Sequence, residues 1–150
     1  MDETTDGWEP LATSPFADLV GPIHVRRLLP GTSTVLFRTV VGQNAANTMG
    51  KMHGGYSSAL VDICTGQGVK RIVADGRSLV TVSTHIDFLG SAALGDTLDI
   101  VVAADKVTRS VVFASCVISV HDSVDGSIGG AAVRAAVVFS SREKPALPPA

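Results

Sequence analysis

The sequence predicts an α+β domain in which one long buried helix is wrapped by a largely antiparallel sheet of about six strands. Two observations lead to this prediction. Apolar residues recur at every second position before and after residues 54–73, whereas within that stretch they recur at helical spacing. The later strands are joined by short connections, as in an antiparallel meander, and such a sheet commonly needs cover on one face only.

Two strands are expected ahead of the helix, over residues 24–29 and 32–41. The second strand alternates, and one of its faces carries Val35, Phe37, Thr39 and Val41. A polar loop over residues 42–52 follows, with two asparagines and Gly50. The change from alternation to a polar, glycine-containing segment indicates that the first part of the sheet ends here.

The helix is expected from Gly54 to about Val73. Its apolar positions cover most of the circumference and include Ala59, Leu60, Ile63, Cys64 and Val69. A helix that is apolar nearly all round is typical of a buried helix. Gly66 and Gly68 each weaken it by about 1 kcal/mol relative to alanine. We expect both glycines to allow a close approach of the helix to the sheet.

Four strands are expected after the helix, over residues 79–89, 97–107, 111–121 and 128–141. In the first of them, one face is expected to carry Val80, Val82, Ile86 and Phe88. Asp125-Gly126 is a hairpin signal between the last two strands, and residues 108–110 form a tighter turn before them.

Length and composition indicate one domain with a shortage of charge. Of 150 residues, 45% are apolar and 17% charged, against about 25% charged in a typical globular protein. The domain is expected over residues 16–141, between a flexible head (1–15) and a flexible tail (142–150). The missing charge suggests that part of the surface is covered by a partner.

Several classes of function are excluded by charge and hydropathy. The net charge is −2 and no basic face is visible, so binding driven by nucleic-acid phosphates is not expected. No run approaches the roughly 20 apolar residues of a membrane span, and the acidic head does not resemble a secretory leader. Cys64 and Cys116 lie far apart in apolar surroundings, as expected for buried, unpaired thiols in a cytoplasmic protein.

The junction of the loop and the helix is the first candidate for chemistry. A helix start presents unpaired N–H groups and a partial positive charge, and Gly54 and Gly55 carry no side chain that would block a ligand. Such a junction can form an oxyanion hole from backbone alone, and Asn47 can add an amide donor. The alternative is that the two glycines simply make a tight turn.

Asp62 is the second candidate, a lone carboxylate between two apolar residues of the helix. Burial would raise its pKa toward the range useful to a general base, although a structural hydrogen-bonded aspartate is the alternative. Asp62 lies eight residues after Gly54, about 12 Å along the helix axis. One carbonyl cannot contact both groups. If both serve one site, they come from different chains of a symmetric dimer with antiparallel helices.

Common motifs for phosphate, metal or nucleotide binding are absent, and no cofactor is expected. The four histidines lack the spacing of metal ligands. His24, His85 and His121 are therefore interpreted as strand-surface residues and His53 as part of the loop.

The string Asn47-x-x-Gly50-x-x-His53-Gly54-Gly55, with Asp62 beyond it, resembles the hotdog-fold acyl-CoA thioesterases of the phenylacetate-degradation (PaaI-like) type. Phe88-Leu89-Gly90-Ser91-Ala92 and Gly95-Asp96 add to the resemblance, which spans about residues 16–141. At Gly90-Ser91, many relatives have Arg-Pro or Ser-Pro instead. The fold of this family is a long helix wrapped by an antiparallel sheet, in dimers that often pair further.

The resemblance implies an acyl-CoA substrate and a homodimer that assembles into a homotetramer. It implies that Gly54 polarises the thioester carbonyl, that His53 shapes the turn, and that Asn47 holds the carbonyl or the attacking water. Asp62 of the facing subunit would be the general base or the nucleophile, and Thr81 would orient water or the carboxylate. The residues expected to contact substrate are Gly55, Phe88 and Arg109, with Lys51, Lys70, Arg71 and Lys106 as further cations for the CoA phosphates.

Two other functions remain open at this point. A hydratase or dehydratase acting on acyl thioesters would keep the fold, but those enzymes carry a proline-rich segment before the helix, and residues 44–52 contain no proline. A non-catalytic acyl-CoA-binding module would bind the ester without releasing a thiol.

Overall fold

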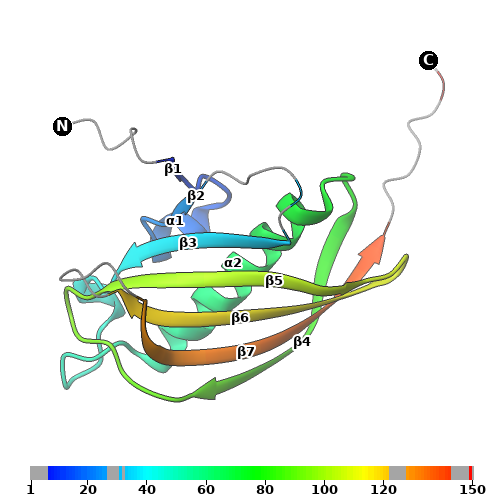
Figure 1. The fold of residues 1–150 in the computed structure, drawn as a ribbon. Helices are drawn as coiled ribbons and strands as arrows, with labels where there is room; N and C mark the ends of the chain where they lie inside the picture. The colour runs from blue at the N-terminus through cyan, green and yellow to red at the C-terminus, as the bar shows by residue number, and fades with distance from the viewer. Residues whose placement is uncertain (1–6, 27–30, 32, 122–127, 143–148, 150) are drawn as a thin grey trace.

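The computed structural model describes residues 7–26, 31, 33–121, 128–142 and 149, which form one antiparallel sheet and two α-helices (Figure 1). The sheet has seven strands in the order β1-β2-β3-β5-β6-β7-β4. Their bounds are Trp8–Pro10 (β1), His24–Arg26 (β2), Thr34–Val40 (β3), Ser78–Phe88 (β4), Thr97–Val107 (β5), Val111–His121 (β6) and Ile128–Arg142 (β7). The predicted α+β class, with one long helix against an antiparallel sheet, is confirmed.

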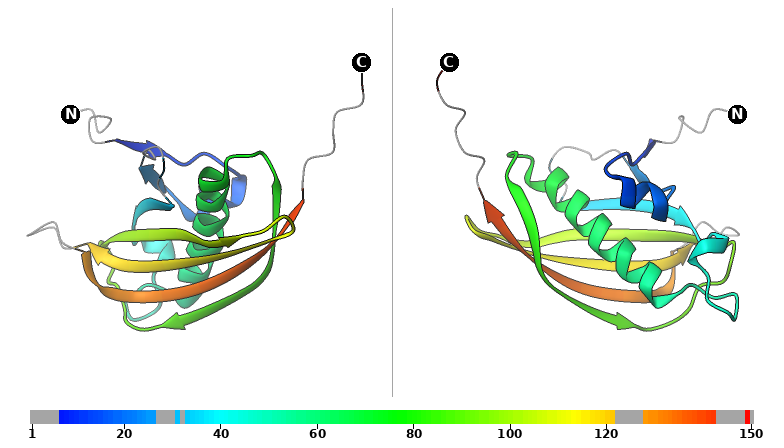
Figure 2. Two further views of the ribbon diagram at one scale, coloured as in Figure 1. Left: turned by 45° about the vertical axis from the view of Figure 1, so that its right-hand side comes forward. Right: turned by 180° about the vertical axis from the view of Figure 1, so that it is seen from behind.

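The long helix α2, Gly54–Val73, lies across the hollow face of the curved sheet (Figure 2). The short helix α1, Pro15–Val20, packs beside it. The side of α2 toward the sheet is buried and consists of Ser57, Leu60, Val61, Cys64, Thr65, Gly68 and Val69. The opposite side is uncovered and includes exposed Gly54, Asp62 and Lys70, so the expectation of a helix buried all round is wrong for a single chain. Apolar spacing alone did not reveal that the sheet reaches around only half of it.

The core fills the space between α2 and the inner face of the sheet. Along β3 the expected alternation is confirmed, because Val35, Phe37 and Thr39 are buried, as is Val41 just after the strand. Gly68 allows the predicted close approach, since an added Cβ would lie 2.7 Å from Cγ1 of Val102 on β5. Gly66 does not, because an added Cβ there would meet no atom within 4 Å.

A β-bulge in β4 changes which of its side chains face the helix. Thr81 pairs with Phe139 of β7, but the next paired residue, Ser83, lies opposite Val138, so Val82 is left without a partner. Opposite residues of paired strands share a face. After the bulge the inner face continues with Thr84, Ile86 and Phe88. The prediction that Val80 and Val82 share a face with Ile86 and Phe88 is therefore wrong.

The N-terminal part contributes structure that the sequence did not indicate. Trp8–Pro10 pairs with β2 as a seventh strand, and Leu11 is buried. The expected flexible head is thus wrong from residue 8 onward, because a short strand with a proline is acceptable at a sheet edge. Residues 27–29 of the first expected strand, residue 32 of the second, the Asp125-Gly126 turn and residues 143–148 of the expected tail lie outside the described residues. None of the described helices is long and apolar enough to cross a membrane.

Candidate active site

The loop before α2 is shaped by Asn47. Its Oδ1 accepts hydrogen bonds from the N–H groups of Met49 (2.9 Å) and Lys51 (3.1 Å). The turn closes at Gly50, whose φ of +69° favours glycine. The Asn47 oxygen is therefore engaged, whereas its Nδ2 donates to no group in the described ranges of the chain. An amide donor thus remains free near the helix start.

A second segment, Ala92–Asp96, supports this loop from the side. The Met52 N–H donates to the Ala92 carbonyl at 2.8 Å, and the Leu94 N–H donates to the Gly50 carbonyl at 3.1 Å. Asp96 accepts the Ala93 N–H at 2.8 Å, which holds the supporting turn together. Sequence reasoning had noted Gly95-Asp96 but had not connected it to the loop, because the two segments are some 40 positions apart in the sequence.

The start of α2 includes a backbone donor that no described residue accepts, the Gly54 N–H. His53 is the N-cap residue, and its Nδ1 accepts the Gly55 N–H at 2.8 Å. The Gly54 N–H donates to no partner among the described residues. Phe88 lies against Gly54, because a Cβ added to Gly54 would be 3.5 Å from the phenyl Cε1. Gly54 is therefore a free donor at a helix N-terminus, beside an aromatic ring.

The carboxylate of Asp62 is held by Thr81. The Thr81 hydroxyl donates to Oδ1 of Asp62 at 2.8 Å, across from α2 to β4. The pair is exposed in the single chain, so the expected burial of Asp62 is wrong there. The reason is its position on the uncovered side of α2. A carboxylate with a hydroxyl on one oxygen keeps its other oxygen available to accept a proton or to attack a carbon.

The two halves of the candidate site do not meet within one chain. Gly54 with Phe88 forms one group, and Asp62 with Thr81 forms the other, about two helical turns away. This agrees with the separation expected from the sequence.

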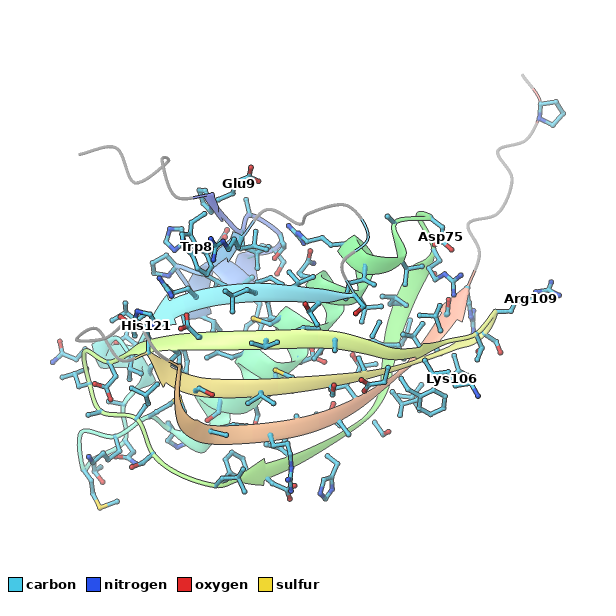
Figure 3. The ribbon with its side chains drawn as sticks, in the orientation of Figure 1. Trp8, Glu9, Asp75, Lys106, Arg109 and His121 are labelled. Carbon is cyan, nitrogen blue, oxygen red and sulfur yellow. The ribbon has the colours of Figure 1, made fainter. Side chains whose placement is uncertain are left out.

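Arg109 lies away from both groups, at the tip of the β5–β6 hairpin (Figure 3). The tip is tied to the connection between α2 and β4, because Arg77 Nη1 donates to the Thr108 carbonyl at 2.8 Å. The cations at this end are Lys70, Arg71, Arg77, Lys106, Arg109 and Arg142. Arg77 is paired with Asp75, and its guanidinium lowers the pKa of that carboxyl.

Cys64, Cys116 and Tyr56 are titratable groups whose pKa values are raised by burial. Burial raises the pKa of Cys116 to about 12 and that of Cys64 well above its usual value, so the prediction of buried free thiols is confirmed. Burial also raises the pKa of Tyr56.

His121 is not a plain surface residue, although His85 is. The Nδ1 of His121 lies 2.7 Å from Oδ2 of buried Asp99. The other carboxylate oxygen of Asp99, Oδ1, accepts a hydrogen bond from Nε of Arg38 at 2.8 Å. Arg38 in turn stacks over Trp8, 4.6 Å from the ring centre. Figure 3 shows Trp8 and His121 on the side of the molecule away from Arg109. Within the described ranges, no three metal-binding side chains come together.

Comparison with known proteins identifies the family. The sequence model of the thioesterase superfamily matches residues 49–126, which include the end of the loop, all of α2 and the β5–β6 hairpin. The chain is 32% identical over 116 residues to "Putative esterase PA0474" of Pseudomonas aeruginosa, covering 77% of this chain and 85% of that protein. The chain belongs to the thioesterase superfamily.

Solved structures of other thioesterases share this fold, which is the hotdog fold. One is the "Hypothetical Thioesterase Protein with Coenzyme A" from Streptococcus pneumoniae TIGR4, with a TM-score of 0.68 and 21% identity over 83% of this chain and 88% of that one. Another is zebra fish thioesterase superfamily member 2, with a TM-score of 0.69 and 22% identity over 85% of this chain and 87% of that one. At these identities the similarity establishes the fold.

Proposed function

We propose that this thioesterase-superfamily chain hydrolyses acyl-CoA thioesters to a free acid and CoA, as a member of the PaaI-like type. The free N–H of Gly54 is the observation that carries the proposal. A helix N-terminal donor without an internal partner is suited to an oxygen that gains negative charge, such as the carbonyl oxygen of a thioester under attack. Asn47 supplies a second donor from the adjacent loop, and His53 fixes the turn by capping Gly55.

The second half of the site is proposed to be Asp62 of the partner subunit. Its carboxylate activates a water or attacks the carbonyl carbon itself, and Thr81 holds the carboxylate in place. In either case the carbon–sulfur bond breaks and CoA leaves as the thiol. Gly55 and Phe88 would flank the bound thioester, because both lie at the helix start.

The edge strand β4 supports such a shared site. An open edge strand with exposed apolar side chains readily pairs with another chain, and Val80, Val82 and Phe88 are each more than half exposed. Suppose that β4 pairs antiparallel with a second copy about a two-fold axis midway between Thr81 and Phe88. Thr81 of one copy then lies opposite Phe88 of the other. Asp62 is thereby brought to the partner's Gly54, at two equivalent places.

The same arrangement accounts for Arg109. Antiparallel pairing of β4 places the beginning of this strand in one copy beside its end in the other, so the cationic end of one copy adjoins the partner's Gly54. Lys70, Lys106 and Arg109 form no ion pair with other described residues. We propose that Arg109 contributes to binding the CoA phosphates. Pairing of two such dimers into a tetramer is part of the proposal.

Subunit complementation tests the shared site. Gly54→Pro removes the N–H, Asp62→Asn removes the carboxylate, and both variants are expected to be inactive on a panel of acyl-CoAs assayed by thiol release. Dissociated and reassembled as an equal mixture, they should recover about a quarter of the wild-type rate, because half of the dimers are mixed and each has one intact site. No recovery, despite mixed dimers shown by mass spectrometry, would refute the shared site. Absence of thiol release by the wild type, with saturable ester binding, would favour the binding module.

A further inference from the structure

Gly66 leaves an open space on α2 that nothing inside the chain uses. Glycine weakens a helix relative to alanine, and Gly68 has a packing reason for this cost in its 2.7 Å approach to Val102. A Cβ at Gly66, by contrast, would meet no atom within 4 Å. The right-hand view of Figure 2 shows the outer side of α2 free of the sheet. The space therefore lies open to a molecule from outside the chain.

This space adjoins the proposed catalytic carboxylate and continues toward a cation. Gly66 follows Asp62 by four residues and Lys70 follows Gly66 by four, so the three lie on one side of the helix, about 6 Å apart along its axis. Lys70 forms no ion pair with any described residue. Together they define a shallow track, Asp62–Gly66–Lys70, that begins at the carboxylate and ends at an unneutralised ammonium group.

The track ends at a pocket of about 390 Å³ between the end of α2 and the start of β4. Its lining is Lys70, Val73, Asp75, Gly76, Arg77, Ser78 and Leu79. The pocket joins the track to the cationic end of the molecule, because Arg77 contacts the hairpin that carries Arg109. A ligand lying on the track would thus be small and neutral beside Gly66 and anionic at its far end.

We propose that the pantetheine arm of the CoA ester lies over Gly66 and that Lys70 binds the diphosphate at the end of this arm. This inference rests on the proposed function, since it assumes the thioester carbonyl at Asp62. A slender, uncharged arm fits the space left by a missing Cβ, and an ammonium group is a suitable partner for a diphosphate. The structure thereby ranks Lys70 above Lys51, which lies in the loop at the other end of α2.

Steady-state kinetics with three thioesters test the proposal. The three share one acyl group and differ in the thiol, which is CoA, pantetheine or N-acetylcysteamine. Lys70→Met should raise KM for the CoA ester about tenfold at unchanged kcat, the size expected for a hydrogen bond to a charged group, and should leave the pantetheine ester unaffected. The matched control Arg26→Met, at an exposed cation of β2, should leave all three unchanged. An equal effect of both variants on the CoA ester, or an effect of Lys70→Met on the pantetheine ester, would overturn the assignment.

Gly66→Leu tests the track itself, because a branched side chain would fill the space. It should lower kcat/KM for the CoA and pantetheine esters at least tenfold, and lower it less for the N-acetylcysteamine ester. A loss of kcat/KM that is the same for all three thiols would place the acyl group over Gly66 and overturn the proposal. Dissociation of the dimer in sedimentation would overturn it too, by assigning the space to the partner subunit.

Calorimetric titration with free CoA separates the two proposals. Wild-type protein that binds CoA, with binding weakened about tenfold in Lys70→Met, would support the track even if no ester is hydrolysed. Hydrolysis by the wild type, with CoA binding unchanged in Lys70→Met and in Gly66→Leu, would refute the track and leave the proposed function standing.

Discussion

Replacing Gly54 with proline removes one hydrogen-bond donor while leaving the helix start intact. Proline is well accepted at the first helical position, where its fixed φ suits the helix and its missing N–H has no internal partner. Gly54 is this position, and its N–H is unpaired among the described residues. The preceding residue, His53, has φ −70° and ψ 138°, the extended conformation that a following proline requires.

The expected effect is large on activity and small on stability. Loss of one oxyanion-hole donor lowers kcat by about 10²–10³-fold, or roughly 3–4 kcal/mol of transition-state stabilisation. Proline inside a helix costs about 3 kcal/mol, but at the first position no internal hydrogen bond is lost. The melting temperature should therefore stay near that of the wild type while turnover falls by at least two orders of magnitude.

Gly54→Ala is the matched control because it keeps the N–H. Its Cβ would lie 3.5 and 3.7 Å from two phenyl carbons of Phe88, which is ordinary van der Waals contact. The assay is steady-state thiol release from an acyl-CoA, with circular dichroism to verify the helix. Gly54→Pro with more than half of the wild-type kcat/KM, or equal losses in the two variants, would refute the role of this N–H.

Further predictions concern the carboxylate, the thiols and the packing of α2. Asp62→Asn should lower kcat about 10²–10⁴-fold with ester affinity within a few-fold, measured by steady-state kinetics and by calorimetry; full activity would eliminate Asp62. Thr81→Val, which removes the hydroxyl on Asp62, should lower kcat about tenfold and leave KM nearly unchanged. Because burial raises the pKa of Cys64 and Cys116, neither thiol should react with a thiol reagent in the native protein at pH 8, and both should react after unfolding. The same raised pKa values mean that stability is fully present below the ordinary thiol range and falls as the pH rises above about 8.5, which denaturant titrations at several pH values will show. Gly68→Ala should destabilise the fold by about 1–3 kcal/mol through its clash with Val102, whereas Gly66→Ala should stabilise it by up to about 1 kcal/mol; equal melting temperatures would contradict the packing seen here.

Local sequence was sufficient for the helix and for the separation within the site. The change of period from two to 3.6 marks α2, which runs from Gly54 to Val73 as expected. Because the helix has a fixed rise per residue, the eight positions between Gly54 and Asp62 already placed these groups too far apart for one carbonyl. The shortage of charge likewise pointed to covered surface, and the exposed apolar side chains of β4 show where such cover is needed.

Other features depend on contacts between segments that are distant in the sequence. Trp8–Pro10 is too short to show a period of its own and becomes a strand by pairing with β2. The supporting turn at Ala92–Asp96 reaches the Asn47 loop only through the folded chain. Burial of α2 was predicted for the whole circumference because apolar spacing records hydrophobicity but not how far the sheet extends.

The bulge at Val82 is the clearest feature that only the tertiary structure decided. Thr81 and Phe88 are seven positions apart, so in a regular strand they would point to opposite faces. One extra residue reverses this alternation and places both on the face of α2, where Thr81 meets Asp62 and Phe88 meets Gly54. The sequence by itself determined that a free helix start and a lone carboxylate occupy one helix at a fixed spacing, because both properties are local. Which strand residues meet those two groups was decided by pairing with β7, since register is a property of two segments and not of one.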